Sequence, residues 1–213
     1  WQYGALTWTD GVHTVRSPIV ARSGQPIIAP AYTESDRAAG SRTMTITTGF
    51  AGKMSAVTGG MKEIVAVAGS VPEGPSGAFN SVELMASSCA AGTNGVQATA
   101  VSFSGATMAA QFELFDRETS VPGAEDLDLV MVNAAGQLVA YSANEGSNEI
   151  ISVSAPAPGN YRVCVVGYST AGASTAYRLH QVVVTTADKG GNLRALVPSQ
   201  VFNGGKATVP VSW

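Results

Sequence analysis

The sequence is short of charge. Lys, Arg, Asp and Glu make up 13% of its 213 residues and leave a net charge of −3, which is about half the usual charged share. The twelve basic residues form no cluster, so the sequence lacks the basic patch that nucleic-acid binding or an anionic membrane surface requires. No apolar run approaches the roughly 18 residues that a membrane-spanning helix needs. We therefore expect partners that are neither nucleic acid nor membrane.

Helix-forming composition is scarce as well. The chain has few Lys and Glu, many Thr and Val, and 24 Gly spread along its length, a balance typical of a β-rich protein. No segment predicts a convincing helix of ten residues. The segment 83–90 is compatible with either a weak strand or a single turn of helix.

Residue types that carry out catalysis are also few. The two histidines, His13 and His180, both lie in alternating segments that predict strands, and no G-x-S-x-G motif occurs. The stretch GATMA at 105–109 lacks a serine. A nucleophilic triad needs a base within hydrogen-bond reach of its nucleophile. We therefore expect no catalytic residues, no enzyme activity and no required cofactor in this chain.

The chain begins at Trp1 with neither an initiator Met nor the basic, apolar and small-residue order of a signal peptide. We expect it to be an internal fragment or a processed product.

The two cysteines, Cys89 and Cys164, leave two alternatives open. They are compatible with one disulfide in an oxidising compartment or with two buried free thiols. Strand alternation places Cys164 on the face opposite Val163 and Val165, whereas Cys89 falls in a segment of irregular pattern before a strand.

Strand signals recur along the whole chain. Residues 3–22 alternate on both sides of Asp10-Gly11, which is the strongest short hairpin signal. From Ser41 onward, alternating segments and glycine turns follow one another at the spacing of an antiparallel sandwich. The pattern predicts an all-β fold: an antiparallel β-sandwich of jelly-roll or Ig-like kind, with flanking strands from neighbouring β-domains.

The same pattern divides the chain into four parts. These are a terminal hairpin at 1–24, a Pro-containing linker at 25–40, the sandwich at 41–186, and a linker with the start of a further β-domain at 187–213. The strands within 4–22 and 192–213 have exposed edges and no partner in this division. We expect them to pack on each other or on another copy of the chain.

Charge concentrates in one place, the turn between two alternating segments at 111–132. Five of the fifteen acidic residues lie within thirteen positions there: Asp116, Glu118, Glu125, Asp126 and Asp128. We expect the two segments to form the central hairpin of the sandwich, with the acidic turn at its tip.

These carboxylates are the best candidates for a metal site. Calcium takes six to eight oxygen ligands, and an extended residue 127 turns Asp126 and Asp128 to the same side. Asp116 would meet them across the turn, and Glu118 and Glu125 would complete the shell. The candidate ligands are therefore Asp116, Asp126 and Asp128, with calcium as the candidate ion. The alternative is a solvated acidic turn in which one Asp accepts hydrogen bonds from backbone amides.

Three features resemble the bacterial pre-peptidase C-terminal domain, an accessory β-sandwich that follows many secreted proteases. They are the pair Asp126-x-Asp128 leading a strand, PGNY at 158–161 leading into a late strand, and the tyrosine-containing strand YRL at 177–179. The resemblance covers residues 41–185 and has no landmark within 60–95.

Separately, GALTWTDGVHTVRSPIVAR at 4–22 is similar to the last two strands of the fibronectin type III-like domain of subtilisin-like proteases. Together the two resemblances imply the C-terminal region of a secreted subtilisin-like serine endopeptidase, downstream of its catalytic domain. The extracellular location that they imply favours a Cys89–Cys164 disulfide.

The function implied by these resemblances is non-catalytic: an accessory region that aids secretion, stability or substrate anchoring, with the parent's catalytic domain as its partner. The alternative is a module that binds an insoluble protein or glycan, such as collagen or a polysaccharide, through an exposed row of aromatic side chains. Aromatic residues make up only 7% of the chain and form no dense cluster, so ordinary packing competes with that interpretation.

Overall fold

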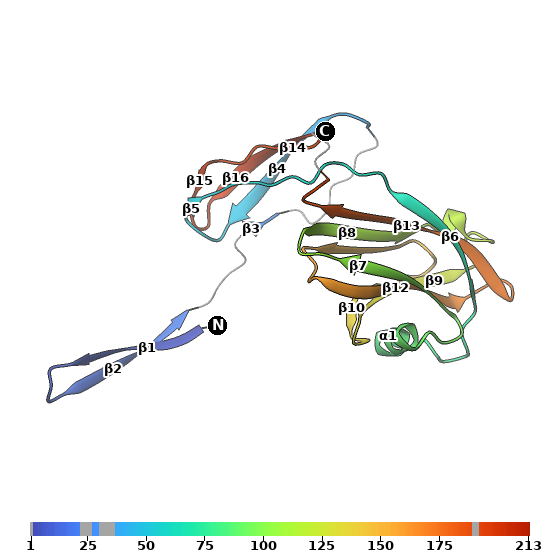
Figure 1. Ribbon diagram of the computed structural model, residues 1–213, viewed down its shortest axis with the longest axis horizontal. Helices are drawn as coiled ribbons and strands as arrows, with labels where there is room; N and C mark the ends of the chain where they lie inside the picture. The colour runs from blue at the N-terminus through green and yellow to red at the C-terminus, as the bar shows by residue number, and fades with distance from the viewer. Residues whose placement is uncertain (1, 22–26, 30–36, 189–191) are drawn as a thin grey trace. The chain divides into compact units, whose positions relative to one another are not determined.

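A computed structural model describes residues 2–21, 27–29, 37–188 and 192–213 (Figure 1). Almost all of its regular structure is antiparallel strand, which confirms the prediction of an all-β sandwich. The chain divides into two compact units. Gly59–Gly190 forms one, and Trp1–Thr58 together with Gly191–Trp213 forms the other.

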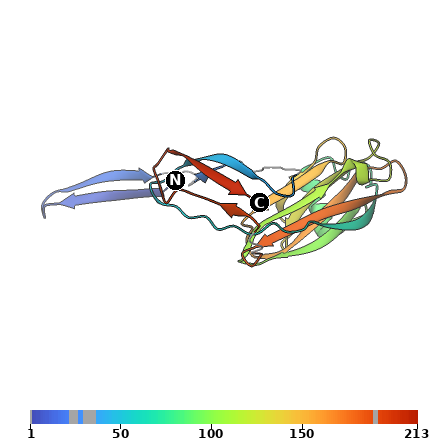
Figure 2. The same ribbon diagram turned by 90° about the horizontal axis from the view of Figure 1, so that it is seen from above.

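The unit Gly59–Gly190 is the sandwich, and its two four-stranded sheets face each other (Figures 1 and 2). The β9 sheet has the strand order β10 (Leu138–Ser142), β9 (Asp126–Asn133), β12 (Gly159–Ser169) and β7 (Val96–Phe103). The β8 sheet has the strand order β11 (Glu149–Ser154), β8 (Thr107–Leu114), β13 (Ser174–Thr185) and β6 (Val65–Pro72). Every neighbouring pair is antiparallel.

The main core lies between the two sheets and follows the strand alternation. Leu127, Leu129 and Met131 of β9 point into it, as do Phe112 and Leu114 of β8. Full burial of a side chain of this size stabilises the fold by about 1.5–3 kcal/mol. These facing rows therefore hold the sheets together.

The outer face of the β9 sheet is covered too, by the helix α1 (Val82–Ala91). The residues of this second core come from the helix, the segment before it, β9 and β12: Phe79, Met85, Ala86, Cys89, Val130, Val132, Cys164 and Val166. As a result, all six residues 127–132 of β9 are buried, and the strand has no solvated face.

The helix corrects the prediction that no ten-residue helix occurs, and it assigns 83–90 to a helix rather than a strand. Ser81 caps its start, where the Leu84 N–H donates to Ser81 Oγ at 3.3 Å. Gly92 ends it in the left-handed region with φ +68, and its N–H donates to the Ser88 carbonyl. An N-cap serine and a glycine after the last turn are ordinary helix boundary signals. Among the described residues, no helix is long and apolar enough to cross a membrane.

The two cysteines form a disulfide, which decides between the alternatives left open by the sequence. Cys89 of α1 bonds to Cys164 of β12 across a Cα–Cα distance of 5.8 Å and 75 positions of sequence. Cys164 lies on the outer face of the sheet, while its neighbours Val163 and Val165 face the main core, as the alternation predicted. The bond fastens the helix to the sheet that it covers.

The segment 111–132 is not a hairpin, which corrects that expectation. β8 and β9 lie in different sheets and do not pair with each other. The chain crosses from one layer to the other through the 3-10 turn η1 (Asp116–Glu118) and the residues that follow it. The reason is that both strands bury a hydrophobic row, and the rows meet by facing each other across the core.

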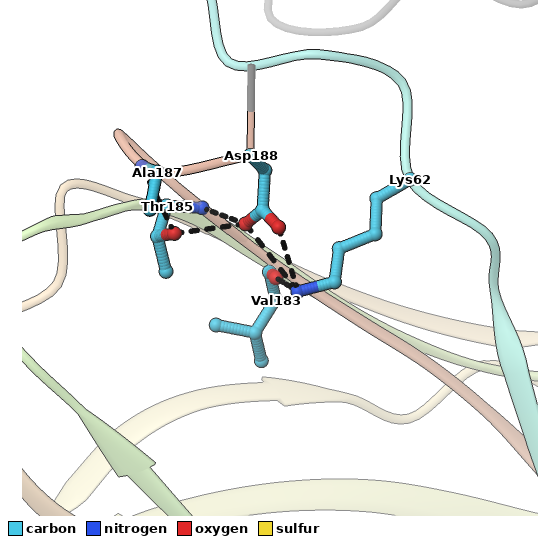
Figure 3. A network of polar contacts seen from close by, with 5 residues as sticks. All are labelled: Lys62, Val183, Thr185, Ala187 and Asp188. Carbon is cyan, nitrogen blue, oxygen red and sulfur yellow. Dashed lines mark hydrogen bonds and ion pairs between the residues drawn. The ribbon is translucent and has the colours of Figure 1, made fainter. Parts of the chain in front are cut away.

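A polar clasp joins the two ends of the sandwich unit (Figure 3). Lys62 Nζ donates to the Val183 carbonyl at 2.9 Å and lies 3.2 Å from Asp188 Oδ1. Asp188 Oδ2 in turn accepts from the backbone and hydroxyl of Thr185, at 2.7 and 2.8 Å. The Gly60 N–H donates to the Asp188 carbonyl. The first residues of the unit are thereby tied to the end of β13.

The other unit pairs strands from distant parts of the chain. Its larger sheet has the order β14 (Arg194–Ala195), β16 (Lys206–Ser212), β4 (Ser41–Thr48) and β3 (Ile27–Ile28). A smaller sheet pairs β15 (Gln200–Val201) with β5 (Gly52–Lys53).

These pairings correct the predicted boundaries. Residues 41–58 do not belong to the sandwich unit, the predicted linker 25–40 contains the paired strand β3, and 192–213 completes sheets with 41–53. The residues 22–26 and 30–36 of that linker lie outside the described residues. Alternation identified β4 and β16 as strands, but it carries no information on which strand pairs with which.

The N-terminal hairpin is confirmed over the described residues. β1 (Gln2–Thr9) pairs with β2 (Thr14–Ala21), with Trp8 opposite Val15. Asp10 Oδ1 accepts from the N–H groups of Val12 and His13 and so closes the predicted turn. The expected contact with 192–213 is not found as strand pairing, because the strands of that segment pair with β4 and β5.

Removing the disulfide should destabilise the sandwich. We expect the Cys89→Ala, Cys164→Ala double variant to lose about 2–5 kcal/mol of unfolding free energy, because the unfolded chain regains a long loop. Urea unfolding with and without reductant measures the loss, and reductant should affect only the wild-type chain. Equal stability of the two proteins would contradict this.

The clasp should protect the end of β13. The backbone and hydroxyl of Thr185 and the charge of Lys62 lower the pKa of Asp188 below 3.8, so the clasp is present above that pH and is lost as pH falls through the lowered pKa. We expect Asp188→Ala to speed amide hydrogen exchange at Thr185 near neutral pH. The exposed Glu63 supplies the control, Glu63→Ala, which should exchange at the wild-type rate.

Candidate acidic site at the start of β9

The structure separates the five carboxylates of the acidic turn. Glu118 Oε2 lies 2.6 Å from Nε2 of His180. Glu125 Oε2 accepts from the Thr175 hydroxyl at 2.6 Å and from the Val121 N–H at 3.0 Å. Burial alone would raise the pKa of Glu125, but these hydrogen bonds outweigh it and lower the pKa. Glu118 and Glu125 therefore make contacts within the fold. The sequence predicted these two residues only as additional ligands that would complete a calcium coordination shell.

Asp116 does not meet the other two predicted ligands in a common hollow. It begins η1, where its N–H donates to Asn148 Oδ1 at 3.1 Å. Its Oδ1 is buried without a hydrogen-bond partner. It is absent from the residues that line the hollow containing Asp126 and Asp128.

Asp126 and Asp128 do come together, as the alternation predicted. They line one open hollow of about 260 Å³ on the outer face of the β9 sheet. Its remaining lining comes from α1, the loop before β11 and the end of β12: Met85, Ala143, Asn144, Glu145 and Tyr168. No Lys or Arg is among these residues.

The loop 143–148 is held against the start of β9 by two buried side chains. Ser147 accepts from the Leu127 N–H at 3.1 Å and donates to the Glu125 carbonyl at 3.0 Å. Glu149 accepts from the backbone N–H and the side-chain amide of Asn144, at 2.9 and 3.0 Å, and from the Ser142 hydroxyl. These contacts fix where Asn144 and Glu145 stand beside the two aspartates.

The surroundings of the hollow disfavour the ionised form of the carboxyl groups in and beside it. Burial, together with the carboxylates of Asp126 and Glu149, raises the pKa of Asp128 to about 7. Burial and the nearby Glu145 raise the pKa of Asp126, although a hydrogen bond from the Gly146 N–H opposes the effect. Burial also raises the pKa of Glu149, although its hydrogen bonds oppose the effect. Each of these groups is more easily protonated than a free carboxyl, because negative charge is confined here.

The arrangement is not a closed metal centre. Within the part of the chain that the structure describes, no three His, Cys, Asp or Glu side chains converge closely enough to hold a metal ion as they stand. Two strand carboxylates share the hollow, and Glu145 is an exposed side chain at its rim.

Sequence reasoning missed Asn144, Glu145 and Glu149, although a signal existed. The segment ANEGSNE at 143–149 holds two carboxylates and two amides within seven positions. Nothing local in the sequence indicates that β10 and β11 bring this loop to the start of β9.

The two histidines lie in separate structural contacts. His13 Nδ1 is 3.0 Å from Asp10 Oδ2 in the hairpin turn. His180 bonds to Glu118 and packs edge-on against Phe115, with ring centroids 5.0 Å apart. Among the described residues, the contacts of the two histidines are therefore hydrogen bonds to carboxylates and ring packing.

Comparisons with known proteins leave the family open. No family model matches the chain, and no curated protein matches it. A solved structure titled as the crystal structure of the infectious bursal disease virus VP2 subviral particle is similar over 97% of this chain and 49% of that chain, with 16% identity and a TM-score of 0.29. This chain therefore spans about half the length of that one, and a TM-score so low carries no argument.

Neutralising Asp128 should stabilise the protein when no cation is present. The pKa of Asp128 is about 7 in the folded chain and 3.8 for a free Asp. Protonation of Asp128 therefore favours the folded state. This contribution to the free energy of unfolding is complete below pH 3.8 and is lost as pH rises through 7. Above pH 7 and in chelator, we expect Asp128→Asn to raise the unfolding free energy by at least about 1 kcal/mol, the value of a single pKa unit.

Urea unfolding at several pH values measures this difference, which should shrink in mild acid. Glu63→Gln is the matched control, because it removes an exposed carboxylate of the same unit. A destabilising Asp128→Asn, or a gain that does not depend on pH, would contradict the electrostatic account.

Proposed function

We propose that this chain is a non-catalytic accessory region of a secreted subtilisin-like serine endopeptidase, and that it contributes to stability, secretion or substrate anchoring. The observation that carries the proposal is the match between the sequence features and their structural roles. The Asp126-x-Asp128 pair leads the twice-covered strand β9, and PGNY at 158–161 leads into its neighbour β12.

Two further features support the proposal. The disulfide between α1 and β12 suits an oxidising compartment. β1 and β2 pair as a hairpin with the Asp10 turn at its tip, which is compatible with the two final strands that the fibronectin type III-like resemblance implies. An all-β sandwich of this kind hosts many functions, so the argument rests on these residues rather than on the fold.

The coding sequence immediately upstream tests the parent class directly. We expect a subtilisin-type catalytic domain there, and a different enzyme class would overturn the proposal. The purified chain should also leave casein and small ester substrates intact. Hydrolysis that disappears in the His180→Ala variant would show a catalytic role and contradict the non-catalytic part of the proposal.

A second candidate function, polymer binding, is favoured by two exposed tyrosines of the β9 sheet. Tyr141 is 53% exposed and Tyr168 is 46% exposed. Tyr141 pairs directly with Val130 of β9 and therefore shares the outer face of the sheet. Tyr168 lines the acidic hollow itself. Exposed aromatic rings on one face supply contact area for an extended polymer.

Sedimentation with insoluble collagen, chitin or cellulose tests this candidate. If the face binds, we expect Tyr141→Ala with Tyr168→Ala to reduce retention. Phe202→Ala is the control, because Phe202 is an exposed aromatic residue of the other unit. Wild-type protein that is retained on none of these polymers would exclude polymer binding and would leave the accessory role standing.

A further inference from the structure

The acidic hollow lies where the apolar cover of β9 stops. Along the outer face of the strand, Val130 and Val132 are packed under α1 with Met85. The next two positions on the same face are Asp128 and Asp126. Met85 borders the hollow, so the polar positions begin at the margin of the helix. Two carboxylates thus occupy positions that strand burial would assign to apolar side chains.

The burial of these two carboxylates is only partly compensated, since one backbone N–H, that of Gly146, donates to Asp126. Asp128 is only 3% exposed, and it lines the hollow together with Asp126, where no Lys or Arg side chain is among the lining residues. Asp126 Oδ1 is buried with no hydrogen-bond partner. Buried charges in proteins are ordinarily paired or coordinate a metal, so a charged group that completes the site is expected.

The missing group is positive and takes oxygen ligands. The polar side chains around the hollow are carboxylates, the Asn144 amide and the Tyr168 hydroxyl. The Asn144 side-chain NH₂ donates to Glu149 and Ser142, which leaves its carbonyl oxygen as a further acceptor. A hard divalent cation prefers such an all-oxygen environment.

We propose that this hollow is a calcium site in which Asp126 and Asp128 are strand-borne ligands and Glu145 closes over the ion. Glu145 is exposed and is near enough to Asp126 to act on its charge, so a side-chain rotation brings a third carboxylate. That rotation accounts for the lack of a closed three-residue group before binding.

Calcium fits this hollow better than the other cations. A single ammonium group would balance one charge, whereas Asp126, Asp128 and Glu145 together bring three. Magnesium demands near-ideal octahedral geometry and usually keeps several waters, while calcium accepts six to eight oxygens in flexible geometry. An open site made from a strand and a loop suits the larger ion.

Binding would cross-link two parts of the sandwich. Asp126 and Asp128 belong to β9, while Asn144 and Glu145 belong to the loop between β10 and β11, which are strands of different sheets. An ion held by both parts would fasten the connection between the layers at this end. The site depends on the sandwich alone and not on the identity of the parent protease.

Thermal unfolding and terbium luminescence of the whole chain test the site. After treatment with chelator, we expect millimolar CaCl₂ to raise the midpoint of the wild-type protein more than MgCl₂ does. Tb³⁺, a calcium substitute excited through nearby tyrosine, should give sensitised emission that CaCl₂ displaces. Tyr168→Phe should keep the calcium shift, because the tyrosine hydroxyl is not among the proposed ligands, and its emission should fall.

Three variants separate binding from folding. Asp126→Asn and Asp128→Asn should each weaken calcium binding by at least about tenfold, since affinity follows the number of charged ligands. Asp116→Asn, outside the hollow, should bind as the wild type does. Asp128→Asn is expected to remain folded, because it removes like-charge repulsion.

Either of two results would overturn the site. The first is a wild-type midpoint that calcium leaves unchanged or that magnesium raises equally. The second is a calcium shift and terbium emission that survive in both Asp126→Asn and Asp128→Asn. A loss in Asp116→Asn as large as that in the other variants would likewise refute the assignment to this hollow.

Discussion

The burial of β9 on both faces is the constraint on which the rest of the sandwich depends. A sheet packed against one partner can leave its other face to water, but residues 127–132 of β9 are all buried. Val130 and Val132 would be exposed without α1. The ten-residue helix is too short to be stable alone in water. Its own packing and the disulfide from Cys89 to Cys164 hold it in place.

The acidic hollow follows from the same constraint. One short helix covers only part of the outer face, so the strand changes from valine to aspartate at the margin of the cover. If those carboxylates were fully solvated, their ionised form would cost the folded state little free energy. Instead, the loop 143–148 is pinned over them by Ser147 and Glu149. The negative charge is thereby buried, and this burial raises the pKa of Asp128 to about 7.

Local patterns predicted what is local and failed where partners are distant. Alternation correctly placed Cys164 away from Val163 and brought Asp126 and Asp128 to one side. It could not show that β4 pairs with β16, since their partners are separated by most of the chain. The helix was missed because its apolar residues are not gathered on one face at helical spacing, although Ser81 and Gly92 mark its two ends. Asp116 does not line the hollow of Asp126 and Asp128, since β8 and β9 enter different sheets.

Some interactions that stabilise this sandwich form in any aqueous solution, and others depend on the redox state, pH or ions of the solution. The facing rows of Phe112 and Leu129 would hold the sheets in any aqueous compartment. The Cys89–Cys164 bond needs an oxidising environment, and relief of the repulsion at Asp128 needs either protons or a cation. With the calcium site proposed above, such a chain would be at its most stable where oxidant and calcium are plentiful, as they are outside cells. The proposed extracellular role therefore agrees with the conditions under which the disulfide of α1 and the proposed ion beside β9 would both be present.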